Sequence, residues 1–182
     1  MSFYPLVVSL HNLVTVVLIL GLVLLMAGLW VIRRSIEVQR ICSWVRLAEI
    51  GTFTLTLGAV LLLLTGGYLM YWVWKFNFAW LNFSLLALLL ITPLVPLFIS
   101  SRLRVIRETA EAERAVGGAL RRAVGDSSLW AASLVVGSVS LGIAALMVLK
   151  PSGLIAFAIL LVSAAVALVL AVLLEGQRMV EV

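Results

Sequence analysis

Five apolar runs, each long enough to cross a lipid bilayer, take up most of this 182-residue chain. A membrane-spanning helix needs about 20 predominantly apolar residues, because the hydrocarbon core of a bilayer is about 30 Å thick. Inside that core every backbone N–H and C=O group must find a partner within the protein, so such runs fold as helices. We therefore predict an all-α polytopic membrane protein, a single domain formed by a bundle of five transmembrane helices. The predicted spans are about 5–32, 47–74, 79–100, 129–149 and 153–174.

Composition agrees with a membrane protein and excludes a water-soluble domain. The chain is 64% hydrophobic and only 12% charged, with a mean hydropathy of +1.25. A soluble domain of this size keeps much of its surface in water and needs more polar residues to cover it. A net charge of +5 would suggest nucleic acid in a soluble protein, but here the basic residues flank the apolar runs. That placement is the one that sets membrane topology, so we predict no nucleic-acid partner.

The basic residues are divided unevenly between the two sides of the predicted bundle. Of the 13 lysines and arginines, only Lys75 and Lys150 lie in the connections on one side, and the others are arginines on the opposite side. Basic residues are enriched in cytoplasmic loops. We therefore predict an N-terminus outside the cell, a cytoplasmic C-terminus and a basic cytoplasmic segment at 101–127. The arginines behind this orientation are Arg33, Arg34, Arg40, Arg46, Arg102, Arg104, Arg107, Arg114, Arg121, Arg122 and Arg178.

Two features interrupt the helical pattern in the middle of the chain. Pro93 and Pro96 lie inside the third span, where proline removes a backbone donor and should kink the helix. The 101–127 segment should continue that span as a helix until Gly117-Gly118 breaks it. A short second helix is then expected over Ala119–Val124.

Small and polar residues recur at helical spacing along the second span. Gly51, Thr54, Gly58, Thr65 and Tyr68 follow the a and d positions of a heptad and are expected to share one face. Small residues let helices approach closely, and hydroxyls can bond across the contact. The stripe predicts either tight helix packing, which we favour, or a polar ligand cavity between the second and fourth spans. The fourth span carries Ser133, Gly137, Ser138, Ser140 and Gly142, and the fifth carries Ser163, Ala167 and Ala171.

His11 is the only histidine and lies within the first span. At 1.5 Å per residue it is about 9 Å below Pro5 along the helix, and an ionisable residue at that depth suggests a function. A neutral imidazole is an axial ligand of haem iron. The second ligand would then be Met70, Met147 or a residue of a second copy. The alternative is an interfacial histidine bonded to a backbone carbonyl, to water or to a tyrosine such as Tyr68.

Residues for acid–base chemistry are scarce in the predicted spans. Glu49 is the only acidic residue near a span interior, and Arg46, one turn away, is its expected partner. No second carboxylate lies at membrane depth. A proton relay or paired acid–base catalysis within the spans therefore has too few ionisable residues. The single cysteine, Cys42, excludes an intrachain disulfide. The sequence therefore favours a non-enzymatic protein, and we assign no catalytic residue.

Several segments resemble a group of small bacterial membrane proteins. This group includes copper-resistance-D-like proteins, haem-biosynthesis J-type protoporphyrinogen oxidases and, most similar, a family of predicted integral membrane proteins of unknown function. The resemblance covers roughly Tyr4 to Pro151, so the fifth span lies beyond it, and it implies a multi-pass protein of a bacterial plasma membrane. From the oxidase group it further implies a haem held by His11. The segments are Tyr4 with Leu10-His11, Gly28-Leu29-Trp30, Leu63-Leu64-Thr65-Gly66 and Ala145-Leu146-Met147-Val148-Leu149-Lys150-Pro151.

Two functions from different classes follow from these features. The first is a non-catalytic membrane subunit or scaffold that acts through helix–helix contacts with other membrane subunits or with a second copy, and it requires no cofactor. The second is a redox protein that binds haem b through His11. Both place the protein in the lipid bilayer.

Overall fold

The computed structural model of this protein describes residues 3–113 and 116–179, with side chains up to residue 173. Every regular element in these ranges is a helix, and 5 helical runs are long and apolar enough to cross a membrane. The predicted all-α bundle of five transmembrane helices is confirmed. The elements are α1 (Tyr4–Arg34), α2 (Val38–Leu69), the π-helical η1 (Met70–Trp74), α3 (Ala79–Ile91), the π-helical η2 (Val95–Ile99), α4 (Ser100–Ala112), α5 (Gly118–Val124), α6 (Ser127–Leu149) and α7 (Gly153–Met179).

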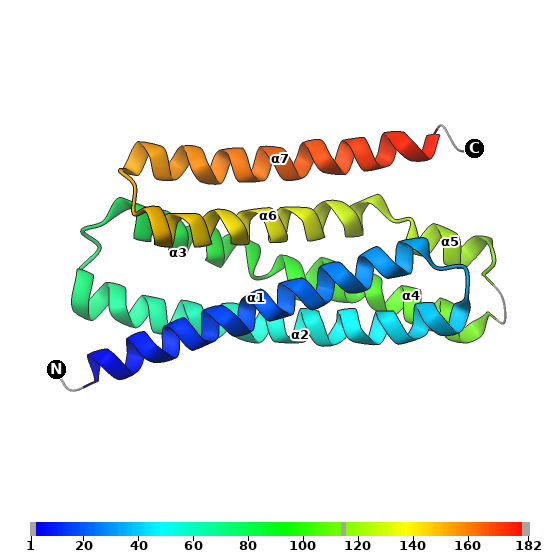
Figure 1. Cartoon of the computed structure of the whole chain (residues 1–182), viewed down its shortest axis with the longest axis horizontal. Coiled ribbons are helices and arrows are strands. Elements are labelled where there is room, and N and C mark those ends of the chain that lie inside the picture. The colour runs from blue at the N-terminus through cyan, green and yellow to red at the C-terminus, as the bar shows by residue number, and fades with distance from the viewer. Residues whose placement is uncertain (1–2, 114–115, 180–182) are drawn as a thin grey trace.

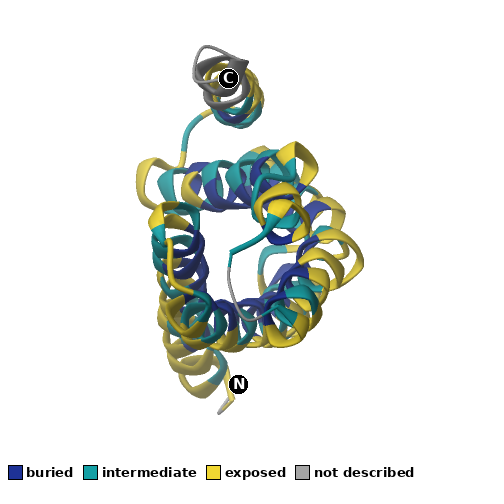
Figure 2. Ribbon diagram, turned by 90° about the vertical axis from the view of Figure 1, so that its right-hand side faces the viewer, coloured by how far each residue is buried: buried dark blue, intermediate teal, exposed yellow. Residues whose placement is uncertain are grey.

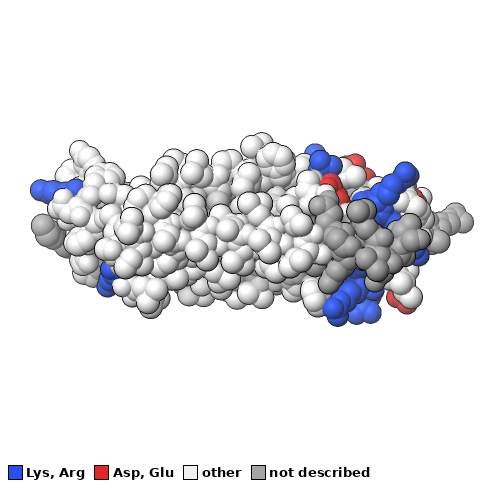
Figure 3. Space-filling view, turned by 90° about the horizontal axis from the view of Figure 1, so that it is seen from above, with Lys and Arg blue, Asp and Glu red and all other residues white. Residues whose placement is uncertain are grey.

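The long helices run side by side along one axis, with the two termini at opposite ends (Figure 1). One end, here called the lysine end, holds the start of α1 and the α2–α3 and α6–α7 connections with Lys75 and Lys150. The opposite end, the arginine end, holds the α1–α2 connection, α4 and α5. On the face drawn in Figure 3, a belt without charged atoms separates the two ends, as a bilayer core requires. Arg114 and the side chain of Arg178 lie outside the described residues.

Orientation in the membrane is a prediction that cysteine labelling tests. In a Cys42→Ser background, Asn77→Cys at the lysine end should react with a membrane-impermeant maleimide added to intact cells. Ala119→Cys in α5 should react only after permeabilisation, because the arginine-rich end is expected in the cytoplasm. Both positions are exposed, so access to the thiol is matched. Labelling of Ala119→Cys alone in intact cells would reverse the orientation.

Helices α1 and α2 form an antiparallel hairpin in which the two backbones touch. A Cβ atom built on Gly51 would lie 2.6 Å from the backbone nitrogen of Leu25, and one built on Gly21 would lie 2.6 Å from that of Leu55. No larger residue fits at these points without separating the helices. The hairpin is therefore fixed by glycine on both sides. Gly28 and Gly58 make the same kind of close approach.

The two prolines interrupt the third span as predicted. Helix α3 ends at Ile91, and the chain passes through a turn and η2 before α4 resumes a regular α-helix. The Thr92 hydroxyl donates to the Leu88 carbonyl at 2.6 Å, a local bond typical of bent helices. The apolar run and the basic segment thus form one bent rod, which ends at Ala112.

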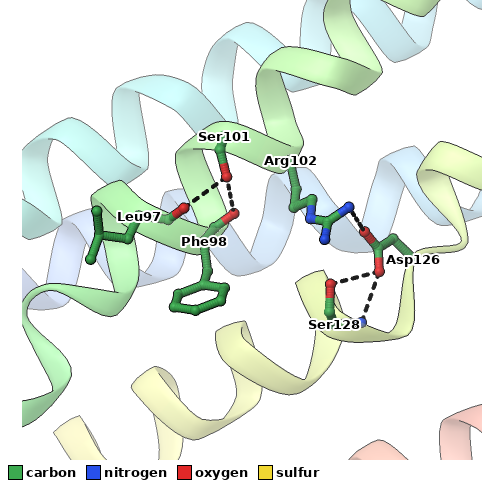
Figure 4. Close-up of polar contacts among 6 residues, drawn as sticks. All are labelled: Leu97, Phe98, Ser101, Arg102, Asp126 and Ser128. Carbon is green, nitrogen blue, oxygen red and sulfur yellow. Dashed lines mark hydrogen bonds and ion pairs between the residues drawn. The ribbon is translucent and has the colours of Figure 1, made fainter.

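An ion pair joins α4 to the start of α6 at the arginine end. Arg102 lies 3.0 Å from Asp126, which precedes α6 (Figure 4). Asp126 also caps that helix, since its Oδ1 accepts from the backbone N–H of Ser128 at 2.9 Å and from the Ser128 hydroxyl at 2.7 Å. A carboxylate at a helix N-terminus satisfies free N–H groups and favours the helix dipole.

The partner of Glu49 comes from another helix. Arg107 of α4 donates to its carboxylate at 3.0 Å and so joins α4 to α2. Our expectation that Arg46 would be the partner was wrong, because α4 packs along α2 and brings a guanidinium group across the interface. Arg46 itself is exposed.

Helix α7 stands outside the ring formed by the other long helices (Figures 1 and 2). It rests on α6 through small residues. A Cβ atom on Gly142 would lie 2.6 Å from the Ser163 hydroxyl, and Ser138 donates to the Ser163 carbonyl at 2.6 Å. Among the side chains of α7 that are described, only Ala156 and Ala167 are buried. The exposed side chains of α7 up to residue 173 are mostly large and apolar and face the surroundings of the bundle.

Candidate functional site

A cavity of about 980 Å³ lies at the lysine end, between α1, α2 with η1, α3 and α6. Its size falls within the range of about 300–1,000 Å³ that is usual for small-molecule and cofactor sites. The α2–α3 and α6–α7 connections form its mouth, where Asn77, Lys150 and Ser152 contribute to the lining. The site is therefore built by residues that lie far apart in the sequence.

The cavity wall changes in character along its length. Farther into the bundle it is lined by Leu18, Leu62 and Leu88, which are buried and come from three different helices. Nearer the mouth the lining includes Trp74 and Trp80. Three hydroxyl residues also line the inner part, namely Thr15, Ser84 and Ser140. A mainly apolar interior with polar groups at the mouth is suited to an amphipathic ligand.

His11 projects from α1 into this cavity and is held by α2. Its Nδ1 lies 2.9 Å from the Thr65 hydroxyl, and that hydroxyl donates its own proton to the Leu61 carbonyl at 2.8 Å. If Thr65 gives its single hydroxyl proton to Leu61, it can accept a hydrogen bond from Nδ1–H. A neutral imidazole in that tautomer carries its lone pair on Nε2. A histidine that ligates a metal is usually oriented in this way by a bond to its other nitrogen.

The residue after Thr65 lies against the imidazole. A Cβ atom on Gly66 would lie 3.4 Å from His11 Cε1, which is van der Waals contact, and Gly66 itself lines the cavity. Sequence reasoning treated Thr65 only as a packing residue and proposed Tyr68 as a partner of His11. The pairing across two helices has no signature in local spacing. The one available signal was the Leu-Thr-Gly segment of the family resemblance.

The two methionines named as possible ligands line the same cavity as His11. Met70 begins η1 and is buried, and Met147 lies half-buried near the end of α6. One imidazole nitrogen and one thioether sulfur form an axial donor pair found in haem proteins. The lining of the cavity thus contains the kinds of donor residue that a haem-type group would need.

The glycines predicted to pack against other helices contact helices of the same chain. Gly51 and Gly58 face α1, and Gly142 faces α7. A Cβ atom built on Gly137 would lie 3.2 Å from Cε of Met26 in α1. Small-residue contacts of this kind stabilise helix pairs in lipid by close van der Waals packing. These faces are consequently occupied by neighbouring helices of the same chain.

Two other residues of the predicted stripe lie away from the helix contacts. Thr54 is half-buried, and its hydroxyl donates to the Ile50 carbonyl at 2.8 Å in its own helix. Tyr68 is 41% exposed on the outside of the bundle, so the structure does not place it in a packing face within the chain or beside His11. The buried face of α2 instead includes Leu55, Leu62 and Leu69.

Sequence reasoning missed the glycines of the first span that complete the hairpin. Gly21 and Gly28 are separated by one heptad, as are Gly51 and Gly58 in the second span. This matching spacing was a usable signal, because two antiparallel helices with the same small-residue repeat can pack against each other.

The fold and the cavity define a polytopic helical-bundle membrane protein with a ligand-sized site at one end. More particularly, the chain belongs to the family described as predicted integral membrane protein (DUF2269), whose model matches residues 5–151. No curated protein and no solved structure matches the chain significantly. The matched region contains the hairpin and most of the cavity lining and ends just before α7.

Proposed function

We propose that this protein binds a haem-type cofactor in the cavity at the lysine end, with His11 as an axial ligand. One observation carries the proposal: the single histidine of the chain has its Nδ1 bonded to Thr65 at 2.9 Å, which leaves Nε2 for a ligand. The cavity beside it is large enough for a flat macrocycle, and Met70 and Met147 contribute to its lining.

The family resemblance supports the same cavity. The segment at the start of α1 contributes Tyr4 and His11, and the Leu-Thr-Gly segment contributes Thr65 as the partner of His11 and Gly66 as lining. The segment that ends α6 contributes Met147, Val148, Lys150 and Pro151. Three segments that are remote in sequence thus converge on one site. The resemblance to the oxidase group, which is a prediction from the sequence, suggests haem as the particular ligand.

A bound haem b would supply reversible one-electron exchange at its iron. The residues of this chain would bind and orient the group. Thr65 would orient the imidazole, and Leu18, Leu62 and Leu88 supply apolar surface in the inner part of the cavity. Apolar surface around a site restricts access of water to a cofactor.

Reconstitution with haem tests the proposal. The purified full-length protein, incubated with hemin in detergent and then separated from free hemin, should retain about one equivalent and show a sharp Soret band that differs from that of hemin in micelles. Empty micelles carried through the same steps measure non-specific partition. A protein that stays colourless, or whose spectrum equals that of the micelle control, would refute haem binding.

A second candidate function is a subunit role through α7, in association with a second copy of the chain. The supporting observation is the position of α7 outside the ring, with large side chains such as Leu154 and Leu161 exposed along it. Helix α7 also lies beyond the residues matched by the family model.

Disulfide cross-linking in membranes tests that role. In a Cys42→Ser background, Leu161→Cys on α7 should give a covalent dimer on mild oxidation. Leu20→Cys on α1 is the matched control, since its exposed fraction of 55% is close to the 59% of Leu161. Equal yields at the two positions would indicate random collision, and α7 would then simply face lipid.

A further inference from the structure

We propose that Lys150 is the anion-binding residue of the cavity, and that the ligand therefore carries an acidic group, which lies at the mouth while its apolar body lies among the helices. The inference rests on the proposed function in taking the cavity as a ligand site. It adds the chemical class of the ligand, an amphipathic carboxylic acid, and the residue that selects it.

The first support is the position of Lys150. It follows directly after α6 and lines the cavity together with Pro151 and Ser152 of the same connection. A lysine at this point can extend its flexible stem along the apolar wall and place its ammonium group at the polar end.

The second support is the distribution of charge. Both ion pairs recorded among the described residues lie at the arginine end, and neither involves Lys150. Within the ranges whose side chains are described, all the acidic residues also lie at the arginine end, as Figure 3 illustrates for one face. The cavity mouth therefore presents a cation without a nearby carboxylate, and an acidic group on the ligand would complement it.

The third support is the match between the cavity and an amphipathic acid. The inner wall is mainly apolar, although hydroxyl residues such as Ser84 and Ser140 also line it, and the cation is at the mouth. A porphyrin has this distribution of chemistry, with an apolar macrocycle and two carboxylate side chains. For the haem of the proposed function, the propionates would be the groups that Lys150 binds.

The chain supplies a matched control for this residue. Lys75 lies at the same end and also follows a helix with a φ of 47°, the same value as at Lys150, but it does not line the cavity. A φ of this sign is the left-handed conformation that glycine adopts without strain. Lys150→Gly and Lys75→Gly therefore each remove one positive charge while relieving the backbone, and both variants are expected to fold.

The experiment compares the two glycine variants with iron-free probes. Binding of protoporphyrin IX and of its dimethyl ester to the full-length protein in detergent is followed by porphyrin fluorescence. Lys150→Gly should weaken binding of the acid about tenfold or more, the usual effect of losing a charge-assisted hydrogen bond. Lys75→Gly should bind the acid like the wild type, Lys150→Arg should restore most of the affinity, and the ester should bind equally well to all four proteins.

Four results would overturn the assignment of Lys150. Affinity for the acid could fall equally in the two glycine variants, or affinity could fall equally for acid and ester. Lys150→Gly could show no loss of affinity, or the wild type could fail to bind protoporphyrin IX. Because the probes lack iron, the outcome is independent of ligation by His11. A protein that binds protoporphyrin IX through Lys150 but forms no His11-dependent haem spectrum would refute haem ligation and retain the acid-binding site.

Discussion

His11→Ala should yield a protein that is inserted and folded but no longer takes up haem. The substitution removes the only imidazole of the chain, and Met70 or Met147 alone would leave the iron with a thioether and no nitrogen ligand. Loss of a primary ligand should exceed the 10–100-fold loss in metal affinity that removal of a supporting hydrogen bond typically causes. Hemin titration followed at the Soret band measures the affinity.

The folded state should barely change in the same variant. Hydrogen bonds between side chains inside a membrane average about 0.6 kcal/mol, so loss of the bond to Thr65 has little effect on stability. The thermal unfolding of His11→Ala, followed by circular dichroism in detergent, should therefore overlay that of the wild type. An unchanged haem spectrum in this variant would refute ligation by His11.

Thr65→Val is the graded control for this site. Valine has nearly the shape of threonine but cannot accept from Nδ1–H, so the imidazole keeps its place and loses its orienting bond. We expect an intermediate loss in haem affinity, about 10–100-fold. Separate Met70→Leu and Met147→Leu variants then identify the second ligand, because only the true ligand should change the Soret position when it is replaced.

Gly51→Ala should destabilise the protein, whereas Gly67→Ala in the same helix should not. The new Cβ at Gly51 would lie 2.6 Å from the Leu25 nitrogen and 2.9 Å from the Gly21 carbonyl oxygen, both of them backbone atoms that cannot rotate away. Overpacking of this kind costs about 1–3 kcal/mol. At Gly67 nothing lies within 4 Å of the added Cβ, so helix preference should stabilise that variant by about 0.5–1 kcal/mol.

The two glycine substitutions thus add the same methyl group to the same helix with opposite expected signs. Denaturant unfolding in detergent, followed by tryptophan fluorescence, measures both changes in the free energy of unfolding. If the two variants were equally stable, the α1–α2 hairpin would not depend on backbone contact at Gly51. The described packing of α1 against α2 would then be incorrect.

The sequence was sufficient for the membrane class and for the positions of the five spans. Bilayer thickness sets the length of an apolar run, and the lack of water in the hydrocarbon forces it into a helix, so both follow from local composition. The break at Pro93 and Pro96 and the segregation of lysines from arginines were predictable for the same reason. Each depends only on residues that are close together in the chain.

The cavity and its contacts required the tertiary structure. Spacing along α2 grouped Gly51, Thr65 and Tyr68 on one face. Gly51 and Thr65 do both meet α1, the first at its backbone and the second at His11, whereas Tyr68 is exposed. A heptad gives the direction of a side chain around its own helix, but it does not say which helix lies opposite. In lipid that choice depends on close packing over the whole bundle, because burial of apolar surface no longer distinguishes one apolar neighbour from another.

The residues that could ligate a metal show the same contrast between what the sequence predicts and what the tertiary structure decides. His11, Met70 and Met147 stood out in the sequence because of their chemistry and their depth in the predicted spans. That they line one cavity, and that Lys150 lies at its mouth, depends on how α1, α2, α3 and α6 come together at the lysine end. Local sequence therefore determined which residues could bind a ligand, and packing between remote helices decided that they share a site.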